Sequence, residues 1–151
     1  MNKINFKEKI LTFIINENNQ LLLLKGSEND PQFHKSFWYV VTGSCEKEDK
    51  DKLETIKREV KEETNLEVIE SIYLNKIFKY KSLGTDCIEY VYLSKVNNAN
   101  IILNEEHTDY KWCEFEEFIK LIYWFEDKTD LINMLKPFLN ISINISYIKK
   151  V

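Results

Sequence analysis

Two apolar segments near the amino terminus place the strongest constraint on how this chain can fold. Residues 9–15 and 20–25 are rich in isoleucine and leucine, and a polar tetrad at 16–19 separates them. Short apolar runs on either side of a polar turn are typical of a β-hairpin. We therefore expect a β-sheet that begins with these two strands.

The rest of the chain shows further strand and helix patterns. After a loop that contains Gly26 and Pro31, residues 37–42 resemble a strand that ends at Gly43, one of only three glycines. We also expect strands over 66–79 and 88–96, joined by a turn at 84–86, and helices over 116–123 and 130–138. The 151 residues, 44% of them apolar, contain no repeat and no linker. One domain over 1–151 is expected, with a C-terminal extension at about 140–151.

The C-terminal extension has a strand pattern of its own. Apolar residues at 141, 143, 145 and 147 alternate with Ser142, Asn144 and Ser146, as in a strand with one buried face. Because an exposed strand invites association, we expect residues 141–148 to pair with a sheet edge. That edge belongs either to the same chain or to a second copy, so a symmetric homodimer stays open.

Charge and composition limit the partners that we expect. The 21 basic and 25 acidic residues nearly balance, at a net charge of −4, which argues against a nucleic-acid partner or a membrane surface. No apolar run approaches the roughly 18 residues that a membrane helix needs. The three scattered cysteines fit reduced thiols better than a disulfide framework or a zinc site. We therefore expect a soluble, cytoplasmic protein.

An amphipathic helix is expected over about 51–64. Its apolar residues recur at three- and four-residue steps and predict one buried stripe: Leu53, Ile56 and Val60. Asp49 or Asp51 can cap the start of the helix. Asn65 is expected to end it, because asparagine tolerates the left-handed conformation that follows a helix.

Three carboxylates of this helix form a candidate cation site. Glu59, Glu62 and Glu63 lie three and four residues apart, so we expect them to share a face turned away from the apolar stripe. Like charges at this spacing destabilise a helix by roughly 0.2–0.5 kcal/mol per pair, and a bound divalent cation would reverse that cost. Oxygen ligands favour magnesium, manganese or calcium over zinc. The alternative is a solvated helix face in a chain that is 30% charged.

The segment around this helix resembles the Nudix box. The pattern G-x5-E-x7-R-E-U-x-E-E-x-G-U, with U aliphatic, is matched within 43–66 at seven positions: Gly43, Arg58, Glu59, Val60, Glu62, Glu63 and Leu66. Asp49 stands where the first Glu of the pattern falls, and eight residues instead of seven then separate it from Arg58. We expect this extra residue to remove Asp49 from the place of its family counterpart. Asn65 replaces the last glycine.

The resemblance continues outside the box and implies a fold. Residues 37–44, FWYVVTGS, and 106–112, EHTDYKW, are similar to stretches of the bacterial branch that includes dihydroneopterin triphosphate pyrophosphatase. In order of elements the likeness covers about residues 9–139. It implies an α/β Nudix fold, in which a mixed β-sheet is sandwiched between helices.

The resemblance also implies roles for individual residues. The expected magnesium ligands, for which Mn²⁺ is a substitute, are Glu59, Glu62, Glu63 and the Gly43 carbonyl. Arg58 would orient Glu59 through a charge-assisted hydrogen bond. Glu106, ahead of its neighbour Glu105, is the expected base that takes a proton from water, which gives a catalytic set of Glu62, Glu59, Arg58 and Glu106. We expect His107 to be structural.

Four further residues are candidates for binding the substrate. Trp38, Tyr39 and Tyr110 can stack on a planar ring, although aromatic residues at strand ends also serve as packing. Lys25 can reach a distal phosphate.

The expected activity is hydrolysis of a phosphoanhydride. The substrate would be a small molecule, a nucleoside or pterin triphosphate or a related nucleoside diphosphate derivative. The alternative is a catalytically weakened Nudix-fold module that binds or senses a ligand. Asp49 and the longer loop motivate that alternative, because aspartate is one methylene shorter than glutamate.

Overall fold

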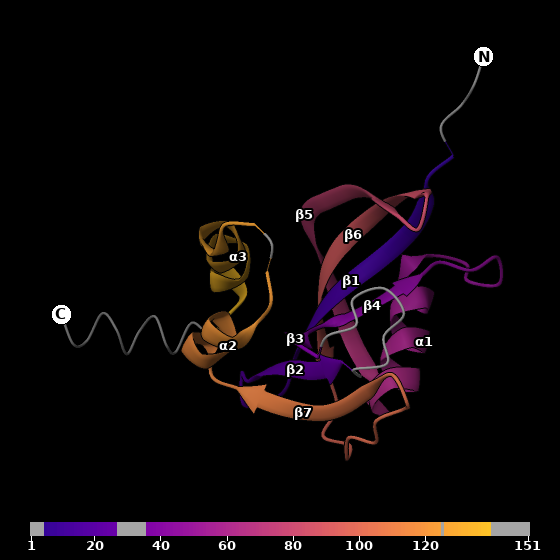
Figure 1. Ribbon diagram of the computed structural model, residues 1–151. Helices are drawn as coiled ribbons and strands as arrows, with labels where there is room; N and C mark the ends of the chain where they lie inside the picture. Colours follow the sequence, from indigo (N-terminus) through magenta and orange to yellow (C-terminus); the bar gives the residue numbers. More distant parts are fainter. Residues whose placement is uncertain (1–4, 27–35, 125, 140–151) are drawn as a thin grey trace.

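The computed structural model describes residues 5–26, 36–124 and 126–139, and these contain a seven-stranded mixed sheet with helices on both faces (Figure 1). The strands are β1 (Lys7–Ile15), β2 (Leu21–Gly26), β3 (Trp38–Tyr39), β4 (Val41–Ser44), β5 (Val68–Ser82), β6 (Thr85–Val96) and β7 (His107–Cys113). The helices are α1 (Lys52–Thr64), α2 (Phe115–Leu121) and α3 (Lys128–Leu135), followed by a 3₁₀ turn at Lys136–Phe138. The strand expected over 141–148 lies outside the described residues.

Strand β1 pairs with three other strands of the sheet, β2, β4 and β6. It pairs in parallel with β6 over its whole length and antiparallel with β4 from Lys9 to Thr12. The expected hairpin partner β2 meets β1 only where Ile15 pairs with Leu21, and β2 instead pairs with β7 over most of its length. The hairpin prediction was therefore correct for the connection between the two strands but wrong for their main partners.

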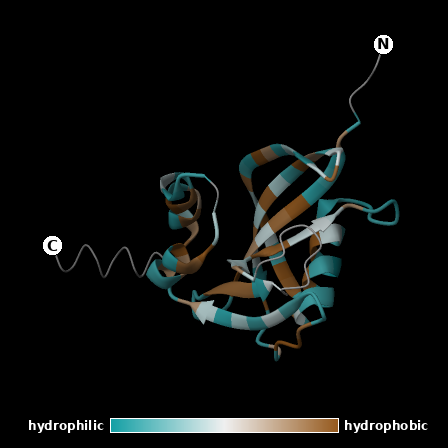
Figure 2. Ribbon diagram, viewed as in Figure 1, coloured by the Kyte–Doolittle hydropathy of each residue, from teal (hydrophilic) through white to brown (hydrophobic). Residues whose placement is uncertain are grey.

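The alternating side chains of β1 fill two separate cores. Leu11 and Phe13 pack on the α2 and α3 side, where Phe118 and Leu131 are fully buried. On the other face Ile10 and Ile14 belong to the cluster that contains the buried residues of α1. A strand that is covered on both faces reads as a continuous apolar run, which explains the amino-terminal pattern. Figure 2 shows this apolar colour along the strands of the sheet.

Helix α1 begins and ends at the expected residues. The side chain of Asp51 accepts a hydrogen bond from the backbone N–H of Glu54, as an N-cap does. Asn65 has a φ of 68°, and its N–H donates to the Lys61 carbonyl, which closes the helix.

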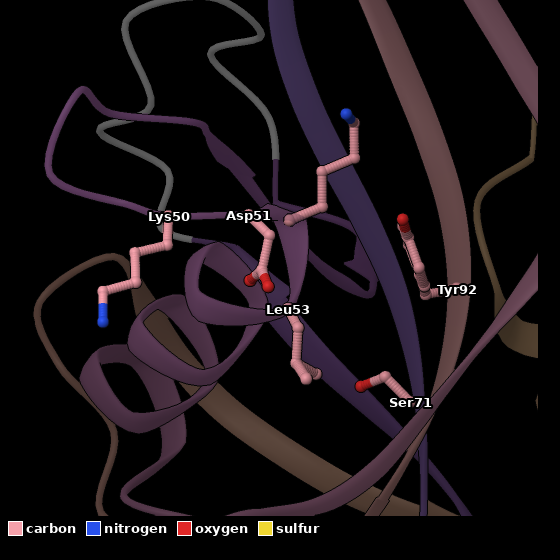
Figure 3. A pocket seen from close by; sticks show the side chains of 6 residues that line it. Lys50, Asp51, Leu53, Ser71 and Tyr92 are labelled. Atoms are coloured by element: carbon pink, nitrogen blue, oxygen red, sulfur yellow. The ribbon is translucent and has the colours of Figure 1, made fainter.

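The predicted apolar stripe of α1 is only partly buried. Ile56 and Val60 are fully buried, whereas Leu53 is 39% exposed, so the prediction was wrong for Leu53. Leu53 lies in the first helical turn and lines an open hollow of about 530 Å³ together with Ser71 and Tyr92. In Figure 3 the Ser71 side chain points toward Leu53, and Tyr92 extends past them along the side of the hollow. The helix thus packs on the sheet through its second and later turns.

Other segments differ from the expected elements. The strand expected over 37–42 is divided into β3, which pairs with β2, and β4, which pairs with β1 and includes Gly43. Strand β7 was not predicted. Strand β5 ends the strand order, which leaves one of its edges without a strand partner among the described residues. None of the helices in these residues has the length and apolar character that a membrane crossing requires.

Candidate active site

The three carboxylates of α1 have different environments. The side chains of Glu59 and Glu62 are 15% and 56% exposed, whereas that of Glu63 is only 4% exposed. The expectation that all three turn away from the apolar stripe was wrong for Glu63, which lies one turn beyond buried Val60 on the same flank of the helix. Glu63 therefore brings a carboxylate into the interface between α1 and the start of β7.

Arg58 is fixed by several acceptors. Its Nη1 donates to Glu59 Oε1 over 2.8 Å, and its Nη2 donates to the Ser44 carbonyl over 3.0 Å and to Asp49 Oδ2 over 2.9 Å. The Asp49 carboxylate raises the pKa of Arg58, so the guanidinium stays charged. These bonds hold Arg58, and through it Glu59, in one orientation.

Asp49 reaches this network despite the extra residue in its loop. Its carboxylate also accepts hydrogen bonds from the Thr55 hydroxyl over 2.8 Å and from the backbone N–H of Glu46 over 2.9 Å. The Asp49 N–H in turn donates to the Glu46 carbonyl, so a tight turn takes up the added residue. Arg58 is the main cause of the lowered pKa of Asp49. The longer loop therefore still brings the Asp49 carboxylate against α1.

Gly43 lies directly against Glu59. A Cβ atom at Gly43 would overlap the side-chain carbons of Glu59, so any larger residue would displace that carboxylate. Gly43 is placed there by β4, where it pairs with Ile10 of β1. The glycine is therefore required by the close approach of β4 to the Glu59 side chain.

A second group of ionisable residues surrounds Glu63. Ligand atoms of Glu63, Glu106 and His107 all lie within 4.8 Å of one another. The pKa of Glu63 is raised well above its usual value, first by burial and then by its carboxylate neighbours, which include Glu59 and Glu106. Burial also lowers the pKa of His107. Glu63 Oε2 is buried and has no hydrogen-bond partner within the described part of the chain.

This arrangement fits a divalent cation. A buried carboxylate beside other acids is costly unless a positive charge compensates it. Carboxylate oxygens are the ligands that Mg²⁺ and Mn²⁺ take in proteins. The residues that the structure brings together here are Glu59, Glu62, Glu63, Glu106 and Gly43.

The expected substrate-binding residues are divided between two places. Lys25 and Trp38 pair across β2 and β3, and the Lys25 ammonium lies 5.8 Å from the Trp38 ring centroid. Tyr110 is 42% exposed on β7 and pairs with Leu24. Tyr39 instead packs beside Trp124, with 6.4 Å between ring centroids, and burial raises its pKa. Tyr39 is thus mainly a packing residue.

Two polar residues of this region were not assigned from the sequence. The Thr55 hydroxyl donates a hydrogen bond to Asp49. The sequence indicated this contact only through spacing, because Thr55 lies six residues after Asp49 and one turn into α1. Glu89 on β6 is buried and accepts a hydrogen bond from the Tyr80 hydroxyl over 2.9 Å. Glu89 is in phase with buried Cys87 and Val91 along β6, so the alternation of the strand was the signal for its inward position. That signal is easily overlooked, because buried glutamates are rare.

The comparisons agree with the pattern seen in the sequence. The model of the NUDIX domain family matches residues 6–134. No curated protein matches the sequence significantly.

Solved structures share the fold. A MutT protein from Methanosarcina mazei superposes with a TM-score of 0.66 at 23% identity, over 80% of this chain and 86% of that one. The Ap4A hydrolase of C. elegans superposes with a TM-score of 0.69 at 24% identity, over 88% of this chain and 97% of that one. The dihydroneopterin triphosphate pyrophosphohydrolase of E. coli superposes with a TM-score of 0.61 at 21% identity, over 85% of this chain and 95% of that one.

Proposed function

Since the chain belongs to the Nudix family, whose hydrolases act on phosphoanhydrides, we propose that it is a metal-dependent pyrophosphohydrolase. Its substrate would be a nucleoside or pterin triphosphate, or a related nucleoside diphosphate derivative. The observation that carries this proposal is the buried carboxylate of Glu63, which has an unpartnered oxygen beside other acids of the Nudix box.

The chain's own residues would divide the work as follows. Glu59, Glu62, Glu63 and the Gly43 carbonyl would hold Mg²⁺ or Mn²⁺, which neutralises phosphate charge and polarises the bond to be cleaved. Arg58 keeps Glu59 in position through the bonds described above. Glu106 would take a proton from the attacking water. Burial and acidic neighbours raise the pKa of Glu63, and a bound cation would favour its ionised form.

Substrate contacts would come from β2, β3 and β7, close to the start of β7 where His107 lies. Lys25 is a candidate for a distal phosphate, and the neighbouring Trp38 ring, with Tyr110 on β7, offers aromatic surface for a planar ring. The neighbours named as an Ap4A hydrolase and a dihydroneopterin triphosphate pyrophosphohydrolase indicate which compounds deserve testing first. Both substrates join a planar ring system to a phosphate chain.

A second candidate function is ligand binding without turnover. This alternative rests on Asp49, which stands where the Nudix box has a glutamate, and on the longer loop before the helix. The contacts of Asp49 with Arg58 and Thr55 weaken this alternative, because the shorter side chain still reaches the helix. A module of this kind would bind one of the compounds tightly and release neither phosphate nor pyrophosphate.

The test is phosphate and pyrophosphate release with Mg²⁺ over a panel of nucleoside triphosphates, a pterin triphosphate, sugar nucleotides and dinucleoside polyphosphates. We expect turnover of at least one class, no turnover in excess EDTA, and losses of several orders of magnitude in Glu62→Gln and Glu63→Gln. Glu67→Gln is the matched control, because Glu67 is 69% exposed and lies just beyond α1. Full turnover in EDTA or in Glu62→Gln would overturn the proposal.

A further inference from the structure

His107 is turned toward the carboxylates of α1 by an irregularity in the sheet. Along the β2–β7 ladder, Lys25 pairs with Asp109 but Gly26 pairs with His107, so Thr108 is an extra residue on β7. Such a bulge redirects nearby side chains and often lies beside a functional site. The His107 side chain is consequently 13% exposed and faces Glu63.

The contact between these two side chains is not a hydrogen bond. His107 Nδ1 and Glu63 Oε1 are 3.7 Å apart, beyond the roughly 2.7–3.2 Å of an N–H···O bond. Within the described residues, His107 Nδ1 and Glu63 Oε2 are both buried and both lack a partner. Buried polar atoms nearly always have a hydrogen-bond partner or bind an ion. These two atoms therefore point to a bound group that the chain itself does not supply.

The spacing suits two ligands of a common ion. Two ligand atoms that are each about 2.1 Å from one cation lie roughly 3 to 4 Å apart. The separation of His107 Nδ1 and Glu63 Oε1 falls in this range. Glu106, which precedes His107, places a carboxylate oxygen within 4.8 Å of both.

We propose that His107 Nδ1 is itself a ligand of the metal ion that the carboxylates bind. This inference rests on the proposed function and changes the expected ligand set from oxygen alone to mixed nitrogen and oxygen. An imidazole ligand favours first-row transition ions over Mg²⁺. We therefore expect Mn²⁺ and Co²⁺ to bind more tightly than Mg²⁺, and His107 to be the source of the difference.

Pulsed electron paramagnetic resonance tests this assignment without any turnover. Untagged protein with ¹⁵N-labelled histidine is loaded with Mn²⁺ in the absence of substrate, and the electron spin-echo modulation is recorded. A coordinated imidazole should give ¹⁵N coupling. The chain has two histidines, so His34→Phe is the matched control and should keep the coupling. His107→Phe should lose it, and so should the smaller polar variant His107→Asn, which guards against a folding defect.

Metal titrations give a second, independent measurement. In His107→Asn we expect Mn²⁺ and Co²⁺ affinity to fall by about tenfold or more, and Mg²⁺ affinity to fall by less. Bound Mn²⁺ without ¹⁵N coupling in the unsubstituted protein would overturn the role of His107 and leave the hydrolase proposal intact. An equal loss for all three ions would also contradict it. Failure of Mn²⁺ to bind would overturn both, whereas bound Mn²⁺ with ¹⁵N coupling but no turnover would overturn only the hydrolase proposal.

Discussion

One guanidinium group joins three parts of the candidate site. Arg58 links Glu59 on the same helix to Ser44 at the end of β4 and to Asp49 in the connecting loop. The contact with Glu59 was predictable, because the motif fixes both residues on one helix. The contact with Asp49 was not, since no sequence rule states how a loop with one added residue closes.

Asp49→Ala is expected to reduce kcat by roughly 10–100-fold, because it frees Arg58 and thereby loosens Glu59. We expect a smaller loss than in Glu63→Gln, which removes a proposed metal ligand. Steady-state kinetics with Mg²⁺ would measure both, and Glu48→Ala is the control at an exposed position in the same loop. A loss equal to that of Glu63→Gln would contradict this ranking, and an unchanged kcat would show that Asp49 is not needed to position Glu59 through Arg58.

Gly43→Ala should reduce activity through steric displacement alone. The added methyl group overlaps the Glu59 side chain, which can swing away, so the cost should fall on catalysis and metal binding more than on folding. Gly26→Ala is a suitable control, because a Cβ there lies 4.0 Å from the nearest atom, the Phe37 carbonyl oxygen. Activity assays and thermal unfolding would separate the two effects. A Gly43→Ala protein with normal turnover would show that Glu59 does not need its present position.

Among the secondary-structure elements, features set by residues close in sequence were predicted better than features set by distant strand partners. The limits of α1 followed from Asp51 and Asn65, because capping depends on residues that are close in sequence. Strand β7 was missed, and β3 and β4 were merged, because strands of two to seven residues are defined by distant partners. The same limit hid His107, whose position depends on a bulge in the β2–β7 ladder.

The buried carboxylate of Glu89 on β6 should make stability depend on pH. Burial raises its pKa in the folded protein, in spite of the hydrogen bond from Tyr80. The folded state therefore keeps a proton that the unfolded state loses above about pH 4.3. This contribution to stability is complete below that pH and is lost as pH rises through the folded pKa.

We expect Glu89→Gln to flatten this pH dependence, because glutamine retains an acceptor for Tyr80 and cannot ionise. Urea unfolding at pH 5 and pH 8 would measure the difference between the variant and the unsubstituted protein. Glu70→Gln is the control, because Glu70 is 57% exposed on neighbouring β5. If the free energy of unfolding of Glu89→Gln fell with pH as steeply as that of the unsubstituted protein, another group would be responsible.

At the scale of the whole molecule, the α/β sandwich followed from the Nudix resemblance, and the structure agrees with it. The amino-terminal apolar run fits this sandwich, because a strand that is covered on both faces needs apolar residues at consecutive positions. The parallel partner of β1 could not be predicted this way. Paired residues of β1 and β6, such as Lys7 and Cys87, are 80 positions apart, and hydropathy does not encode which distant strand pairs with which.

The C-terminal extension beyond the described residues supports one more prediction. Because residues 141–148 alternate like a strand, we expect their removal to lower the melting temperature or to change the mass in solution. A chain that ends at Asn140 would be compared with the full chain by differential scanning fluorimetry and light scattering. If neither the melting temperature nor the mass changed, the docked strand would be refuted.

Among the described residues β5 has one edge without a strand partner, and this has a consequence for how the protein is handled. Lys79 and Lys81 are exposed along this long edge strand, together with half-buried Lys76. Hydrated ammonium groups on a strand edge discourage another strand from docking. Reductive methylation of lysines keeps these charges, whereas acetylation removes them. Of the two treatments, acetylated samples should therefore be the ones that lose monodispersity on concentration.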